Sequence, residues 1–233
     1  MANQSTTHAK ICLIIMTVFI SSCATTPDLK GFWKCDGNAT YSAVFTSSWS
    51  AETHPSDFPE KSHYSDLIGA THNNEVSFWS LGQRVTGGIK DVSELGINRK
   101  FIKEIEWAIK LGSASEVVHG PDLKNSPGSV EVSFQLRPEF SLITLLSMIA
   151  PSPDWFVGVS GIDMCENGSW VVNKTVALKV YDAGTDDGDT YTAEDRATLP
   201  KQAVSVLNSG IHTENGVIPQ LATLTLKLTS SNQ

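Results

Sequence analysis

Three aspartates beside apolar, strand-like runs are the residues best suited to chemistry in this chain. Asp154 lies in the segment APSPDWFVG (150–158), and Asp182 and Asp186 lie in the later segment YDAGTD (181–186). If the two strands pair, the three carboxylates converge at one end of a β-structure. Carboxylates that lie this close repel one another, so the arrangement is favourable mainly when a cation lies between them. Oxygen ligands on flexible loops suit Ca²⁺ better than zinc or copper. The sequence therefore predicts a calcium site formed by Asp154, Asp182 and Asp186.

The alternative interpretation of these aspartates is structural, because aspartate often accepts hydrogen bonds from backbone N–H groups in turns. The acidic stretch continues through Asp187, Asp189, Glu194 and Asp195. These residues could raise the local concentration of cations, but we interpret them mainly as a solvated acidic loop.

Three histidines, His54, His63 and His72, follow one another at intervals of nine residues. Three imidazoles could bind zinc, but this spacing is not that of a common zinc motif, and the sequence contains no HExxH. We therefore expect these histidines to have structural or surface roles.

A loop containing Glu52, His54 and Asp57 is the one place that suggests a hydrolase. The sequence has no GxSxG nucleophile motif, no P-loop and no GxGxxG turn between a strand and a helix. We therefore expect a protein that is not an enzyme, with a hydrolase at this loop as the alternative.

Residues 1–22 are predicted to be a signal peptide. A short polar start ends at Lys10, and an apolar run follows from Ile11 to Ile20. This run is too short to cross a bilayer as a helix but has the length of a signal-peptide core.

Cys23 is predicted to carry a lipid anchor. It follows Ile20, Ser21 and Ser22, and this order of an aliphatic residue, two small residues and cysteine is the pattern of a bacterial lipoprotein cleavage site. Residues 23–34 would then form a tether at the membrane. The alternative is ordinary signal-peptidase cleavage nearby, with Cys23 discarded or left free. We expect an exported protein, either in the bacterial cell envelope as an outer-membrane lipoprotein or secreted.

The formal net charge of the 233-residue chain is −8, and removing the leader would make it more negative because Lys10 would be lost. This charge argues against nucleic acid as a partner. Cys12 lies in the leader and Cys23 at the lipid site, which leaves Cys35 and Cys165. In an exported chain two remaining cysteines are expected to pair, and the long loop that they close would add roughly 4 kcal/mol of stability. The alternative is two separate buried thiols.

Alternating apolar residues predict several β-strands and one clear helix. The helix is expected to start at Asn98, to end at Gly112 and to pack across one end of the sheets, and a second helical stretch is expected near Asp91 to Leu95. The run from Phe140 to Ala150 is interpreted as core chain. This set of predicted elements indicates a mainly β protein, an antiparallel β-sandwich with one or two short helices. The strands are expected near residues 41–49, 130–136, 155–159, 176–180 and 222–228.

Four segments resemble the spondin domain, the N-terminal module of F-spondin and mindin. They are FTSSWSAETHPSDFP, HYSDLIGATHN, MIAPSPDWFVGVSGIDMC and YDAGTDDGDTY, and they place the domain at residues 35–230. The resemblance implies a C2-like β-sandwich and a cysteine before the first core strand and another after the VGV strand.

It also implies calcium binding through the aspartate of PSPDW and the two aspartates of DAGTD, which are Asp154, Asp182 and Asp186 here. Tyr181 stands where many relatives have tryptophan, a change that should affect packing more than coordination.

In larger spondins the domain acts in matrix and cell-surface binding, so the resemblance implies an adhesion or ligand-binding module with an unknown cell-surface ligand. A purely structural envelope lipoprotein is the second alternative. The C2-like fold also suggests calcium-dependent lipid binding. Against this, the acidic loops lack the basic neighbours that anionic headgroups favour, although bridging Ca²⁺ could compensate.

Overall fold

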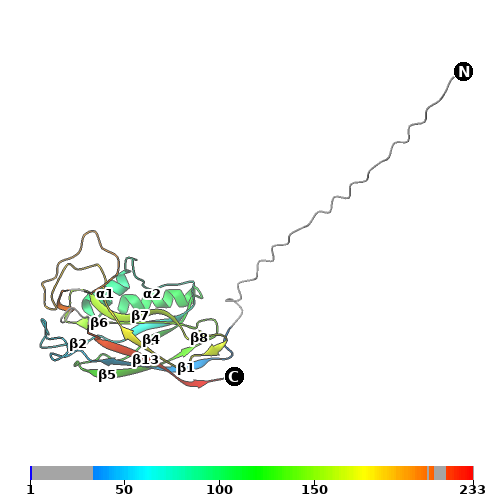
Figure 1. Ribbon diagram of the computed structural model, residues 1–233, viewed down its shortest axis with the longest axis horizontal. Helices are drawn as coiled ribbons and strands as arrows, with labels where there is room; N and C mark the ends of the chain where they lie inside the picture. The colour runs from blue at the N-terminus through cyan, green and yellow to red at the C-terminus, as the bar shows by residue number, and fades with distance from the viewer. Residues whose placement is uncertain (2–33, 209, 213–218, 233) are drawn as a thin grey trace. The chain divides into compact units, whose positions relative to one another are not determined.

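Two antiparallel sheets, a two-stranded hairpin and one layer of helices make up the part of the chain that the structure describes (Figure 1). The computed structural model describes residue 1 and residues 34–208, 210–212 and 219–232. The smaller sheet packs against one face of the larger sheet, and the helices cover the opposite face. The predicted antiparallel, C2-like β-sandwich is confirmed. The predicted signal peptide and the Cys23 lipid site lie outside the described residues.

The smaller sheet has four strands in the order β10-β13-β1-β5. Its apolar side chains alternate with polar ones because only one face is buried. In β1, for example, Tyr41, Ala43 and Phe45 face the core between the sheets. The strands are β1 (Ala39–Ser47), β5 (Gly128–Leu136), β10 (Asn173–Leu178) and β13 (Ala222–Ser231).

The larger sheet has seven strands, six of them in the order β12-β11-β7-β6-β3-β4, with β2 also paired to β6. Its central strands β6 and β7 are mostly apolar rather than alternating, because both of their faces are largely buried. In β7, Trp155 and Val157 face the smaller sheet, whereas Phe156 packs under the helices. The strands are β2 (His63–Tyr64), β3 (Ile68–His72), β4 (Ala114–His119), β6 (Leu142–Ala150), β7 (Trp155–Asp163), β11 (Val180–Asp182) and β12 (Ser205–Val206). A separate hairpin pairs β8 (Cys165–Glu166) with β9 (Ser169–Trp170).

Two α-helices, α1 (Gly87–Leu95) and α2 (Arg99–Lys110), lie on the outer face of the larger sheet (Figure 1). Thr86 caps α1 by accepting a hydrogen bond from the backbone N–H of Ile89. The predicted position of the helix across one end of the sheets is wrong. The apolar stripe of Phe101 and Ile105 needs a broad apolar surface, and the outer face of the larger sheet supplies it.

Asn98 precedes α2 as predicted, but its side chain makes no capping hydrogen bond and instead contacts Asp66. A 3₁₀ turn covers Gly210–His212. Among the described residues, no helix has both the length and the apolar character needed to cross a membrane.

The predicted disulfide between Cys35 and Cys165 is present, with a Cα–Cα distance of 5.8 Å. It ties the chain just before β1 to the β8–β9 hairpin, across a sequence separation of 130 residues. Disulfides persist in oxidising compartments, so this bond agrees with an exported protein.

Candidate functional site

Strand pairing brings the predicted calcium ligands to one end of the larger sheet. β11 pairs with β7 in antiparallel register, with Asp182 opposite Trp155. Asp154 directly precedes Trp155, so Asp154 and Asp182 lie at the same edge, and the backbone N–H of Ala183 donates to the carbonyl of Asp154 at 3.3 Å. The loop that follows β11 then carries Asp186 back toward Asp154.

Asp154 lies at the centre of this arrangement and is fully buried. Its Oδ2 accepts hydrogen bonds from the backbone N–H groups of Thr185 (2.7 Å) and Asp186 (3.1 Å) and from the Thr185 hydroxyl (3.2 Å). Its Oδ1 is equally buried but has no hydrogen-bond partner. A buried carboxylate oxygen without a partner is costly in free energy, so this atom is suited to a ligand that the protein itself does not supply.

Asp182 and Asp186 both accept hydrogen bonds from the loop, as the structural alternative predicts. Asp182 Oδ1 accepts from the backbone N–H of Gly184 at 2.6 Å. The two oxygens of Asp186 accept from the N–H groups of Gly188 (2.8 Å) and Arg196 (2.7 Å). These bonds do not preclude cation binding, because each carboxylate oxygen has more than one lone pair.

The site is electrostatically unfavourable for its own carboxylates. Burial raises the pKa of Asp154 to about 7, and the nearby Asp182 carboxylate adds to the increase. Burial also raises the pKa of Asp182, with further contributions from Asp187 and Asp186. The hydrogen bonds from the loop act in the opposite direction but do not compensate. Positive charge placed here would remove this penalty.

These shifts predict that the calcium-free protein becomes less stable as pH rises. The pKa of Asp154 is about 7 in the folded chain and near 3.8 in its ordinary environment, so the folded state holds this proton more tightly. The resulting stabilisation is complete below about pH 4 and is lost as pH rises through about 7. Melting temperatures in chelator should therefore fall between pH 4 and pH 8, and Asp154→Asn should remove most of that slope. The exposed Asp189 supplies the control, Asp189→Asn, which should leave the slope unchanged; equal slopes in all three proteins would contradict this assignment.

The three carboxylates do not form a closed set of metal ligands by themselves. Within the part of the chain that the structure describes, no group of three or more His, Cys, Asp or Glu side chains is arranged to hold a metal ion. Calcium takes six to eight oxygen ligands, so backbone carbonyls and water would have to complete the site. The unpartnered Oδ1 of Asp154 is the feature that fits a cation.

The three evenly spaced histidines do not share a site. His63 pairs with Ala150 at one end of β6, and His72 pairs with Leu142 at the other end. Eight residues of β-strand span about 27 Å, far too long a distance for two ligands of one zinc ion. His72 instead forms a buried hydrogen bond through Nε2 with the hydroxyl of Thr144 at 2.8 Å, and burial lowers its pKa.

The loop residues considered for a hydrolase do not lie together in an accessible site. His54 is only 1% exposed, so a substrate in solvent would not reach its ring. Asp57 Oδ2 accepts a hydrogen bond from the backbone N–H of Tyr191 at 3.1 Å, and Glu52 is exposed. This geometry does not present an accessible acid–base pair.

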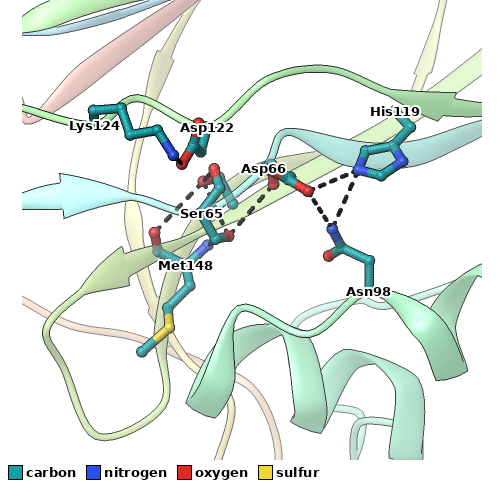
Figure 2. Close-up of polar contacts among 8 residues, drawn as sticks. Ser65, Asp66, Asn98, His119, Asp122, Lys124 and Met148 are labelled. Atoms are coloured by element: carbon teal, nitrogen blue, oxygen red, sulfur yellow. Dashed lines mark hydrogen bonds and ion pairs between the residues drawn. The ribbon is translucent and has the colours of Figure 1, made fainter.

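A polar cluster that the sequence analysis missed joins the segment between β2 and β3, the last residue of β4 and the residue that precedes α2 (Figure 2). Asp66 Oδ2 lies 2.8 Å from His119 Nε2 and accepts a hydrogen bond from Asn98 Nδ2 at 3.0 Å. Asp66 also lines a cavity of about 470 Å³ together with Ser65, Glu94 and other residues. No sequence pattern signals this cluster, because its members are distant in the chain and only tertiary packing brings them together.

Comparison with known proteins gives a consistent family. The family model described as Spondin_N matches residues 39–217. Spondin-2 from Rattus norvegicus is 35% identical over 175 residues, which cover 73% of this chain and 53% of that protein. Spondin-1 from Gallus gallus is 32% identical over 188 residues, which cover 77% of this chain and 23% of that protein. The chain thus spans about half the length of the Spondin-2 relative and about a quarter of the Spondin-1 relative. This chain belongs to the spondin N-terminal domain family.

Proposed function

We propose that this protein is an extracytoplasmic, calcium-binding spondin-domain module that binds a ligand at a surface and does not catalyse a reaction. The observation that carries the calcium part of the proposal is the fully buried Asp154, whose Oδ1 has no partner. The family membership and the absence of an accessible acid–base pair in the Glu52–Asp57 loop support a binding role over catalysis.

Asp154, Asp182 and Asp186 are the residues that would hold the ion, with backbone carbonyls and water. Bound Ca²⁺ would supply the positive charge that these buried carboxylates lack. Asp154 would link the ion to the loop, because its Oδ2 already accepts the N–H groups of Thr185 and Asp186. The loop would then be held in one conformation, and a preordered surface binds a ligand at a lower entropic cost.

We also propose that the protein is exported and anchored through a lipid on Cys23. The Cys35–Cys165 disulfide supports export, and the residues around Cys23 support lipidation. The mass of the mature N-terminal peptide tests the anchor: an unmodified Cys23, or a mature chain that begins after it, would refute lipidation.

Thermal unfolding with and without Ca²⁺ tests the calcium proposal. Ca²⁺ at about 100 times its dissociation constant should stabilise the folded state by about 2.7 kcal/mol, which corresponds to roughly 5–11 °C for a domain of this size. Asp182→Asn should abolish most of this shift because it removes a proposed ligand charge while keeping the side-chain size.

Asp189→Asn is the matched control, since it removes the same charge from an exposed position in the same acidic stretch. It should keep the wild-type shift. The calcium proposal fails if the wild type shows no shift, or if the two variants lose it equally.

A further inference from the structure

Leu199 is an apolar side chain held out in solvent next to the proposed calcium site. It is 84% exposed, and the neighbouring Pro200 is also exposed. A single exposed leucine is unremarkable on a protein surface. What distinguishes Leu199 is that the chain on both sides of it is fixed to the loop that carries the carboxylates.

Hydrogen bonds fix the segment at both ends. On one side, the backbone N–H of Thr198 donates to the carbonyl of Thr185 at 3.0 Å, and the Thr198 hydroxyl donates to Asp187 Oδ1 at 2.5 Å. On the other side, the N–H of Gln202 donates to the carbonyl of Gly184 at 2.8 Å. Leu199 and Pro200 therefore form the tip of a short protruding loop, which has a defined position relative to Asp182 and Asp186.

Basic side chains flank this tip. Arg196 precedes it, is exposed, and donates from its guanidinium to the carbonyl of Asp187. Lys201 follows it and is partly exposed. The expectation that the acidic loops lack basic neighbours is thus wrong, because the turn after Asp187 folds Arg196 back onto the acidic loop.

We propose that the Leu199–Pro200 tip and the adjacent carboxylate loop together dock on the surface of an anionic phospholipid membrane when calcium is present. This proposal rests on the proposed calcium site. Without the ion, the carboxylates at Asp182, Asp186 and Asp187 repel anionic headgroups. With the ion, a headgroup phosphate oxygen can join the carboxylates as an oxygen ligand.

The two basic side chains and Leu199 would contribute to the same contact with the membrane. Arg196 and Lys201 attract the negative surface potential of the lipid, and Leu199 can bury its side chain at the boundary between headgroups and acyl chains. Because hydrogen bonds at Thr198 and Gln202 already fix this protruding loop, docking needs little further ordering of the chain.

Sedimentation with vesicles tests this proposal. Every protein would carry Cys23→Ser, so that an N-terminal lipid could not itself cause binding. The protein with an otherwise wild-type sequence should sediment with phosphatidylcholine vesicles that contain phosphatidylserine when Ca²⁺ is present. It should remain in the supernatant with chelator, or with vesicles of phosphatidylcholine alone.

Leu199→Ser is the decisive variant. It should weaken vesicle binding about tenfold or more, as expected for the loss of one buried leucine side chain, while keeping the full thermal shift with Ca²⁺. Val172→Ser is the matched control, because Val172 is 67% exposed but precedes β10 in the other sheet, and it should bind vesicles as the wild type does. Asp182→Asn should lose both the thermal shift and vesicle binding.

The outcomes separate this proposal from the calcium proposal beneath it. A wild type that shows the calcium shift but does not sediment with phosphatidylserine vesicles would overturn membrane docking alone, and would point to a protein ligand for this surface. Equal sedimentation of Leu199→Ser and wild type would also overturn it. A wild type without a calcium shift would refute the calcium site. Sedimentation that does not depend on calcium would refute the proposal that calcium binding is needed for membrane docking.

Discussion

Removing the Cys35–Cys165 disulfide is expected to lower the free energy of unfolding by about 4–5 kcal/mol. The bond closes a loop across 130 residues, and a loop of this length strongly restricts the unfolded chain in the chain-entropy model. For a domain of this size the loss corresponds to a fall in melting temperature of roughly 8–20 °C. Alanine is the better replacement at both positions, because Cys35 is buried and a serine hydroxyl there would need a hydrogen-bond partner.

Reductant provides the control for this prediction. Wild type in reductant should melt near the Cys35→Ala, Cys165→Ala variant, and reductant should leave the variant itself unaffected. If the variant melts within a few degrees of the oxidised wild type, the bond does not stabilise the fold as proposed.

Gly69→Ala is expected to be the most damaging change of a single methyl group. Gly69 lies in β3, opposite Leu145 of β6, and an added Cβ would lie 1.8 Å from the carbonyl oxygen of Thr144 and 2.9 Å from the Cα of Leu145. These atoms are backbone, so they can move only if the strands separate. Because β3 is hydrogen-bonded on both sides, to β4 and β6, such movement would disturb the centre of the larger sheet. We expect a loss of about 3 kcal/mol or more in the free energy of unfolding, measured by denaturant titration.

Gly87→Ala is the matched control, since a Cβ at this first residue of α1 would meet no atom within 4 Å. It should be neutral or stabilising by up to about 1 kcal/mol, because alanine restricts the unfolded chain and favours the helix. Similar denaturation midpoints for the two variants would show that the strands tolerate separation at Gly69.

Local sequence patterns predicted β1, β5 and β13 of the smaller sheet well, whereas the single strand predicted at 176–180 is divided between β10 and β11, which lie in different sheets. In β5, Val130, Val132 and Phe134 alternate with polar residues because one face is buried and the other is solvated, and such a pattern can be recognised without tertiary information. The short strands β2, β3 and β4 were missed. Ile68 to His72 is buried on both faces and includes Gly69, so it has neither alternation nor strong β-propensity.

The proposed calcium site was predictable in part for a similar reason. Asp182 ends β11, Asp186 lies four residues later in the following loop, and Asp154 directly precedes β7. Because β11 pairs with β7, a single pairing assumption brings the three aspartates to one end of the sheet. The Asp66–His119–Asn98 cluster depends on the packing of a helix against two strands, which no local pattern reports. The Leu199 tip was missed because its position depends on hydrogen bonds from Thr198 and Gln202 to a loop earlier in the chain.

Isothermal titration of Ca²⁺ into the metal-free protein tests the central claim most directly. It measures stoichiometry as well as affinity, and therefore separates a defined site from loose association with the acidic loop. We predict one Ca²⁺ per chain for the wild type and for Asp189→Asn, and no measurable binding at that site for Asp154→Asn, which replaces the buried carboxylate whose Oδ1 has no partner. No heat of binding in the wild type, or the same single-site titration in a folded Asp154→Asn variant, would contradict the account.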